Sequence, residues 1–168
     1  MSIQWRWYRF CDISTRTLYE LLKLRSEVFV VEQQCIFNDL DGADINARHL
    51  LGFLDDDNTI VAYCRVFAPT DEHIHSRGEK ETNIGRVLVN PRFRRKGFGM
   101  QLMMEAMRYL LQDFPNCAIR IGAQRYLSKF YGPSGLGFIE DGEPYDEDGI
   151  PHIDMTYTKH FPTQDQSV

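Results

Sequence analysis

The chain has 168 residues and a formal net charge of -5, with 43% hydrophobic and 26% charged residues, as is ordinary for one globular domain. This acidic balance excludes a general nucleic-acid binder, because such proteins usually present a basic surface. The first residues lack the apolar stretch of a signal peptide, and no run approaches the roughly 18 apolar residues of a membrane span, so we expect a cytoplasmic protein without membrane contact.

Hydrophobic periodicity and turn signals predict the elements of the first half of the chain. Ser14 or Thr15 can cap a helix that runs to about Glu32. In chain order, we expect a strand over 3–10, this helix, a loop over 33–47 with room for a second short helix, strands over 49–54 and 59–67 joined at Asp55-Asp56-Asp57-Asn58, and a polar loop over 68–82.

The second half is expected to complete one mixed sheet. Its predicted elements are a strand over 84–89, a helix over about 98–113, a strand over 118–123, a short helix over 125–131, and closing strands over 137–141 and 152–158. The order β-α-α-β-β-β-α-β-α-β-β is that of an α/β fold with helices on both faces of the sheet. We expect a single domain over 1–161 and a frayed tail over 162–168.

The most informative window lies between Thr82 and Met104, which holds five Lys/Arg residues and no Asp or Glu. Here an apolar run ends at Asn90-Pro91, and a basic turn that contains Gly97 and Gly99 leads into a helical pattern. The free N–H groups and dipole of a helix N-terminus favour an anion, so the window predicts a site for a phosphate-bearing cofactor. The window is not a Rossmann fingerprint, because Leu102 stands where that motif needs its third glycine, and the sequence contains no Walker loop.

The pattern Arg94-x-x-Gly97-x-Gly99 resembles the acetyl-CoA pyrophosphate loop of the GNAT superfamily of N-acetyltransferases. Downstream, Gln124-x-x-Leu127-x-x-x-Tyr131 followed by Gly137-Phe138 resembles that superfamily's second cofactor motif. Segments 25–33, 39–42, 48–52 and 147–153 also resemble the ElaA family of GNAT proteins, and Arg25-x-x-Val28-Phe29 is similar to the start of acyl-homoserine-lactone synthases, which share the fold.

The resemblance implies a GNAT fold, acetyl-CoA as co-substrate and a set of cofactor-binding residues. A main-chain N–H at Leu88 or Val89 would donate to the thioester oxygen, and the amides from Arg95 to Met100 would bind the pyrophosphate. The full set is Val87, Leu88, Val89, Arg94, Arg95, Lys96, Gly97, Phe98, Gly99, Met100, Gln124 and Tyr131.

The resemblance also implies that Tyr131 is the general acid that protonates the departing sulfur, although two extra residues separate it from Gly137-Phe138. In many family members a glutamate on the fourth strand acts as the general base, and this chain has Gly85-Arg86-Val87 at that place. Glu32 and His152 are therefore candidates for the base or for substrate contacts, with Glu27 as a further candidate base.

Arg25, Phe29 and Glu32 are candidates for the acceptor pocket, since Arg25 and Glu32 lie two turns apart on one helix face. A surface ion pair between these two residues is the alternative.

Residues 139–154 carry seven Asp/Glu and no Lys/Arg, which suggests that they border the acceptor site and attract a cationic amine. We expect no metal, because Asp39-x-Asp41-Gly42-x-Asp44 lacks EF-hand spacing. Four dispersed cysteines favour reduced thiols.

The sequence therefore predicts an acetyl-CoA-dependent N-acetyltransferase that acts by direct transfer on a small-molecule or peptide amine. The alternatives are transfer of a longer acyl chain and a non-catalytic acyl-CoA-binding module. A homodimer remains open.

Overall fold

The computed structural model describes residues 3–54, 59–69 and 81–159. Within these residues, eight strands form one sheet in the order β1-β2-β3-β4-β5-β8-β6, with β7 paired to β8. The strands are β1 Ile3–Arg9, β2 Arg48–Leu54, β3 Ile60–Phe67, β4 Glu81–Val89, β5 Ala118–Gln124, β6 Ile139–Glu140, β7 Tyr145–Glu147 and β8 Ile150–Tyr157.

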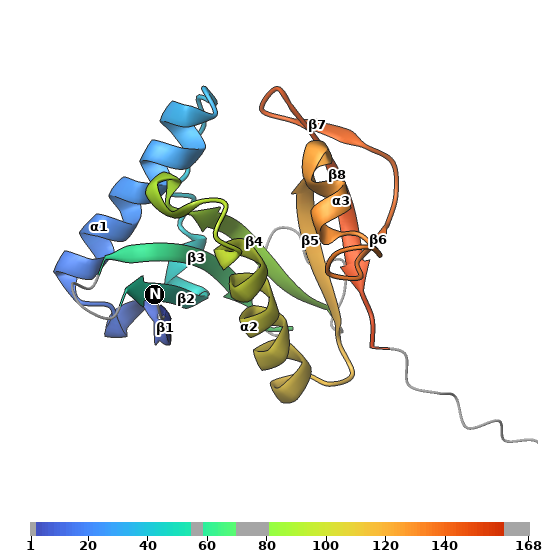
Figure 1. Ribbon diagram of the computed structural model, residues 1–168, viewed down its shortest axis with the longest axis horizontal. Helices are drawn as coiled ribbons and strands as arrows, with labels where there is room; N and C mark the ends of the chain where they lie inside the picture. Colours follow the sequence, from blue (N-terminus) through green and yellow to red (C-terminus); the bar gives the residue numbers. More distant parts are fainter. Residues whose placement is uncertain (1–2, 55–58, 70–80, 160–168) are drawn as a thin grey trace, which may run out of the picture.

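Helices cover both faces of this sheet, as the sequence predicts (Figure 1). The helices are α1 Thr15–Arg25, a π-helix Ser26–Glu32, α2 Phe98–Asp113, α3 Ser128–Tyr131, and 3-10 helices at Phe10–Asp12, Ala43–Asn46, Pro91–Phe93 and Arg125–Leu127. The apolar side of α2 packs with Ile84 and Ile119 in one core, and α1 packs with Leu51 and Leu88 in a second core.

The predicted helix from Ser14 to about Glu32 is confirmed, but its last seven residues form a π-helix. The hydroxyl of Ser14 accepts a hydrogen bond from the amide of Thr17 at 3.2 Å, so Ser14 is the N-cap. In the π segment the amide of Gln33 donates to the carbonyl of Val28 at 3.3 Å. One-turn π segments often mark functional sites, and this one ends at Glu32, next to the pocket described below.

The structure corrects several predicted boundaries. Strand β4 begins at Glu81 rather than at residue 84, β6 is only two residues long, and β7 was not predicted. The turn at Asp55–Asn58, most of the 68–82 loop and the tail 162–168 lie outside the described residues.

Strands β4 and β5 diverge, and this divergence positions the site. They pair in parallel only where Glu81–Asn83 meet Ala118–Arg120. Beyond Asn83 no described strand pairs with the β5 side of β4, and the two strands separate (Figure 1). The carboxyl ends of both strands therefore border an opening rather than a continuous ladder.

A β-bulge lies in the middle of β4. Arg65 of β3 pairs with Gly85, whereas Tyr63 pairs with Leu88, so β4 carries an extra residue there. Arg86 has a φ of 51°, in the left-handed region. Because of the extra residue, side chains before and after the bulge point to opposite faces of the sheet. Ile84 accordingly packs in the core with α2, and Leu88 packs in the core with α1.

Candidate active site

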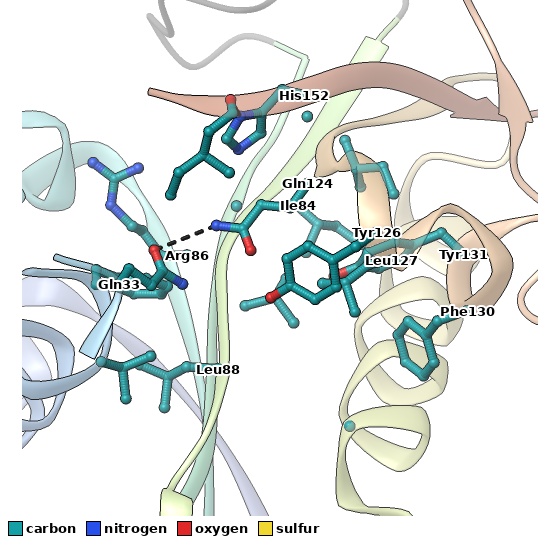
Figure 2. Close-up of a pocket in the computed structure, with 18 of the residues that line it drawn as sticks. Gln33, Ile84, Arg86, Leu88, Gln124, Tyr126, Leu127, Phe130, Tyr131 and His152 are labelled. Atoms are coloured by element: carbon teal, nitrogen blue, oxygen red, sulfur yellow. Dashed lines mark hydrogen bonds between the residues drawn. The ribbon is translucent and has the colours of Figure 1, made fainter. Parts of the chain in front are cut away.

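A pocket of about 540 Å³ lies between the diverging strands. Its walls come from β4, β5, the end of the π-helix, the basic loop before α2, α3 and the β7–β8 hairpin. Figure 2 shows Gln33, Gln124, Tyr131 and His152, from four separate parts of the chain, bordering the same space. The pocket thus brings together residues that are far apart in sequence.

The basic loop meets the pocket at the N-terminus of α2. Gly97 is the N-cap with a φ of 78° and has no side chain to bind the first amides of the helix, which also lack partners within the helix. A Cβ at Gly99 would lie 3.5 Å from Val89 Cγ2 and 3.8 Å from Phe130 Cζ, both in the pocket lining. The loop therefore offers main-chain donors at a place kept open by a missing side chain, as an anion site requires.

Most of the predicted cofactor residues line this pocket. They are Val87, Leu88, Val89, Arg94, Arg95, Gly97, Phe98, Gly99, Gln124 and Tyr131. Lys96 and Met100 are not part of the lining, and the Lys96 ammonium lies 5.6 Å from the centre of the Phe93 ring.

Tyr131 reaches the pocket from the end of α3 and is 6% exposed. Its ring stands edge-on to Phe130 and Phe138, with ring centres 4.9 Å and 6.3 Å away. Burial raises the pKa of the Tyr131 phenol, so the hydroxyl keeps its proton at neutral pH. A neutral phenol at the edge of the pocket can donate its proton through a hydrogen bond.

The two extra residues after Tyr131 are accommodated in a tight turn over Gly132-Pro133-Ser134-Gly135. The amides of Gly135 and Gly137 both donate to the carbonyl of Gly132, at 2.8 Å and 2.9 Å. A Cβ at Gly135 would overlap the carbonyl oxygen of Phe130, so only glycine fits there. The amide of Phe138 then donates to the carbonyl of Tyr131 at 2.9 Å, which fixes the backbone at Tyr131.

His152 lines the pocket from β8, opposite Gln124 in the register of β5 and β8. Its Nδ1 lies 2.8 Å from the carbonyl oxygen of Ile150, and its Nε2 lies 3.8 Å from a carboxylate oxygen of Glu147. The ring stacks on Tyr145 with centres 5.9 Å apart.

Glu32 and Phe29 also line the pocket, at the end of the π-helix. Both carboxylate oxygens of Glu32 accept hydrogen bonds from Arg94, at 2.8 Å and 2.9 Å. This fork joins the helix end to the basic loop. Because both of its oxygens already accept hydrogen bonds from Arg94, the Glu32 carboxylate is engaged, which weighs against Glu32 as the base.

The structure does not bring Arg25 to the pocket. Its side chain is 0% exposed and bonds to the carboxylates of Asp39 at 2.9 Å and Asp44 at 2.7 Å. The expected ion pair with Glu32 is not formed either, because Glu32 pairs with Arg94. A long polar side chain on the inner face of α1 is satisfied by buried carboxylates from a distant loop, which helical spacing alone does not reveal.

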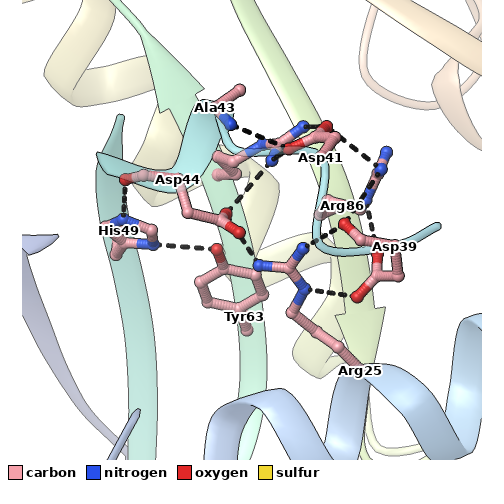
Figure 3. A network of polar contacts seen from close by, with 9 residues as sticks. Arg25, Asp39, Asp41, Ala43, Asp44, His49, Tyr63 and Arg86 are labelled. Carbon is pink, nitrogen blue, oxygen red and sulfur yellow. Dashed lines mark hydrogen bonds and ion pairs between the residues drawn. The ribbon is translucent and has the colours of Figure 1, made fainter. Parts of the chain in front are cut away.

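Arg25 belongs to a network of three arginines and three aspartates, in which four side chains are buried and those of Arg86 and Asp41 are partly exposed (Figure 3). The aspartates are those of the calcium-like pattern, and their partners are Arg25, Arg65 and Arg86. In the described part of the chain, no group of three or more His, Cys, Asp or Glu residues is arranged to hold a metal ion.

Several lining residues were not predicted from sequence, among them Gln33, Cys35, Phe37 and Tyr145. Gln124 Nε2 donates to Gln33 Oε1 at 3.3 Å, and the thiol of Cys35 donates to the carbonyl of Asp148 at 3.5 Å. These contacts join the segment after the π-helix to β5 and to the β7–β8 turn. They depend on the chain folding back, and no local sequence signal marks them.

The chain is similar to known proteins in sequence and in structure. A sequence model of the acetyltransferase (GNAT) domain matches residues 30–159. The UPF0039 protein sll0451 of Synechocystis is 40% identical over 94% of this chain and 96% of that protein. The ElaA protein of Escherichia coli is 39% identical over 91% of this chain and 95% of that protein.

Solved structures show the same similarity. An acyl-CoA N-acyltransferase from Pseudomonas aeruginosa superposes with a TM-score of 0.81 and 36% identity, over 92% of this chain and 99% of that chain. The crystal structure of Escherichia coli ElaA gives a TM-score of 0.78 and 37% identity over the same fractions.

Proposed function

Because the chain belongs to the GNAT acetyltransferase family, whose fold supports acyl transfer from coenzyme A, we propose that it acetylates a primary amine with acetyl-CoA. The transfer would be direct, within a ternary complex of protein, acetyl-CoA and amine. We therefore propose three things together: that the transferred group is acetyl, that the acceptor is a primary amine, and that Tyr131 and the main chain of β4 assist the transfer.

One observation carries the proposal. The anion cradle at the N-terminus of α2 opens into the gap between β4 and β5, and a buried tyrosine borders the same gap. A diphosphate at the cradle would place the rest of an extended coenzyme along β4, which has no partner strand there among the described residues. The thioester would then lie near Tyr131, which can protonate the departing sulfur.

The residues of the loop fit coenzyme A chemically. Arg94 and Arg95 line the pocket and supply charge, while Gly97 and Gly99 allow close approach to the main chain. A main-chain N–H of the bulged part of β4, at Leu88 or Val89, would stabilise negative charge on the acyl oxygen. Bound acetyl-CoA supplies an activated acyl carbon, and the protein orients it.

The one cysteine in the pocket lining supports direct transfer. Burial raises the pKa of the Cys35 thiol, and the negative charges of Asp148 and Glu147 raise it further. Its thiol also donates to the carbonyl of Asp148. A thiol that resists ionisation is a poor nucleophile, so an acylated cysteine is disfavoured.

The charges around β7 and β8 favour a cationic amine. We call this part of the pocket, lined by Tyr145, Glu147, His152 and Asp154, the acceptor side. Nearby, Arg120 meets three carboxylates, with closest distances of 2.8, 2.7 and 3.6 Å. The pocket is therefore richer in carboxylates than in cations on this side, which attracts positive charge.

Free thiol release measures the proposed reaction. The protein is incubated with acetyl-CoA and a panel of amines that includes diamines and neutral amines of matched length. We expect amine-dependent thiol release, with a lower KM for diamines. Saturable acetyl-CoA binding without amine-dependent thiol would instead indicate a non-catalytic binding module, and equal KM values would contradict the cationic preference.

Two further properties belong to the proposal. No helix in the described residues is long and apolar enough to cross a membrane. We propose a cytoplasmic location, where acetyl-CoA is available, and leave a homodimer as an alternative to a monomer.

A further inference from the structure

The part of β4 that lines the pocket, from Asn83 to Val89, carries no carboxylate that could accept a proton from the amine. The one carboxylate of this strand, Glu81, lies outside the lining and accepts two hydrogen bonds from Arg120. Arg86 occupies the bulge, and its Nε donates to Asp39 Oδ1 at 2.7 Å. Glu32 is held by Arg94 in a two-bond fork. The reaction still needs a group that removes a proton from the amine nitrogen.

The geometry points to His152 as that general base and to Glu147 as the residue that positions and stabilises its charged form. This inference rests on the proposed acyl transfer and deepens it. It assigns the base on β8 rather than on β4.

The hydrogen bond to Ile150 sets the tautomer of His152. A carbonyl oxygen only accepts hydrogen bonds, so Nδ1, at 2.8 Å, carries the hydrogen. The neutral ring then has its lone pair on Nε2. His152 lines the pocket with its side chain 12% exposed, so an amine bound in this part of the pocket would lie beside the ring.

Glu147 stands where it can stabilise the protonated ring. Its carboxylate lies 3.8 Å from Nε2, too far for a strong hydrogen bond but close enough for charge attraction. Stacking on Tyr145 holds the ring plane. A histidine held by a carbonyl on one nitrogen and faced by a carboxylate on the other is oriented for proton transfer.

Other groups around the ring reinforce this charge pattern. β5 places the uncharged Gln124 opposite His152. The titratable groups that line the pocket from this part of the fold are Tyr145, Glu147, Asp148, Asp154 and Cys35, and β5 adds Arg120. Arg120 is paired with Asp154 and with two carboxylates outside the lining, at closest distances of 3.6, 2.8 and 2.7 Å. The remaining charges, those of Glu147 and Asp148, favour the protonated imidazole.

The proton transfers balance as follows. The neutral amine nitrogen bonds to the acyl carbon, and His152 Nε2 takes the proton that the nitrogen loses. As the carbon–sulfur bond breaks, sulfur keeps the electron pair and takes the hydroxyl proton of Tyr131. The proton on His152 then passes through solvent to Tyr131, which leaves an amide, a free thiol and both side chains as they began.

Nitrogen NMR on the protein without coenzyme tests the tautomer and the role of Glu147 independently of turnover. We expect the neutral His152 signal, assigned by its loss in His152→Gln, to show a protonated Nδ1 and a bare Nε2. Glu147→Gln should move the His152 titration to lower pH. The matched control Glu143→Gln removes a charge from the same acidic segment outside the pocket lining and should not. The opposite tautomer, or equal midpoints in the two variants, would overturn the inference.

The pH dependence of kcat/KM tests catalysis. We expect kcat/KM of the wild type to fall at acid pH, and we call this fall the acid limb of the profile. Glu147→Gln should move the acid limb to lower pH. His152→Gln should lower kcat by about 10²-fold and should remove the acid limb. Wild type without amine-dependent thiol release would contradict the proposed function. Wild-type turnover with near-normal kcat and an unchanged acid limb in His152→Gln would contradict the base assignment alone.

Discussion

The environment of Tyr131 shows how one side chain acquires a role from its surroundings. Its ring is enclosed by Phe130 and Phe138, and the resulting desolvation raises the pKa of the phenol. The hydroxyl remains protonated, yet the residue still borders the pocket. The raised pKa also makes the phenol a weaker acid, so the proposed role depends on a direct hydrogen bond from the hydroxyl to the departing sulfur.

Replacing Tyr131 by phenylalanine removes the proton donor but keeps the ring and its packing. We expect kcat to fall by about 10²-fold, with the Kd for coenzyme A nearly unchanged. Tyr126→Phe is the matched control, because Tyr126 lines the same pocket but is 74% exposed. Steady-state kinetics and a binding titration give both values, and equal kcat in the two variants would refute the role of Tyr131.

Single residues were predictable where a local pattern or a family motif defined them. Helix chemistry predicts Ser14 or Thr15 as the N-cap, and the structure shows that it is Ser14. Arg25 was predicted to line the acceptor pocket, yet it is buried under Asp39 and Asp44. The sequence shows that Arg25 lies on the helix face but not that two carboxylates 14 and 19 residues later fold over it.

At the scale of elements, the arginine–aspartate network fixes the segment around Asp39–Asp44 against α1, β3 and the β4 bulge (Figure 3). His49 extends it, since its Nε2 donates to the carbonyl of Asp44 and its Nδ1 accepts from the Tyr63 hydroxyl, both at 2.9 Å. Removing one partner of a buried ion pair leaves an uncompensated charge, so the network acts as a unit.

The network predicts that the protein loses stability on acidification. Burial lowers the pKa of His49, so the unfolded chain binds more protons below about pH 6.5 and the free energy of unfolding falls there. For Asp44, burial opposes ionisation, but the hydrogen bond and charge of Arg25 and Arg65 outweigh it and lower the pKa. Its contribution is present above about pH 3.9 and is lost below that value.

Urea unfolding between pH 4 and 8 measures this dependence. We expect the free energy of unfolding of His49→Gln to change less with pH between about pH 5 and 6.5 than that of the wild type, because the titrating group has been removed. A free energy of unfolding that rises as the pH falls from 7 to 5, or an unchanged slope in the variant, would contradict the predicted shift.

Element prediction failed at the β7–β8 hairpin, although a local signal was present. Asp148-Gly149 is a favoured hairpin turn, and both residues have positive φ, 52° and 83°. The short strand Tyr145–Glu147 lacks a hydrophobic run and was hidden by its acidic neighbours. The hairpin brings Glu147 and His152 together, so missing it also hid their relationship.

At the scale of the whole molecule, the site depends on the divergence of β4 from β5. Element order and the family motifs predicted the mixed sheet and the GNAT family, and both are confirmed. Coenzyme binding at the loop before α2 stays a prediction. The divergence itself was not predictable from periodicity, because β4 reads as a fully paired apolar strand. It follows from the bulge and from the shortness of the parallel ladder, which are tertiary features.

The divergent strands turn the sheet into a two-sided site. The N-terminus of α2 borders the gap on one side, and the β7–β8 hairpin borders it on the other (Figure 1). Glu147 and Asp154 line the pocket from that hairpin. A coenzyme and an amine can then approach the same gap from different parts of the fold. The catalytic roles that we propose for Tyr131 and His152 both depend on coenzyme A binding in this gap.

Calorimetric titration with coenzyme A and with pantetheine, which lacks the diphosphate, measures whether the α2 cradle holds the coenzyme. We expect one saturable site for coenzyme A, at least about tenfold tighter than pantetheine, or about 1.4 kcal/mol. Gly99→Ala places a methyl group beside Val89 and Phe130 at ordinary contact distance, so the chain should still fold. The same methyl group should lower the affinity for coenzyme A by a similar factor. No heat with coenzyme A, or equal affinities for both ligands and both proteins, would contradict binding at this cradle.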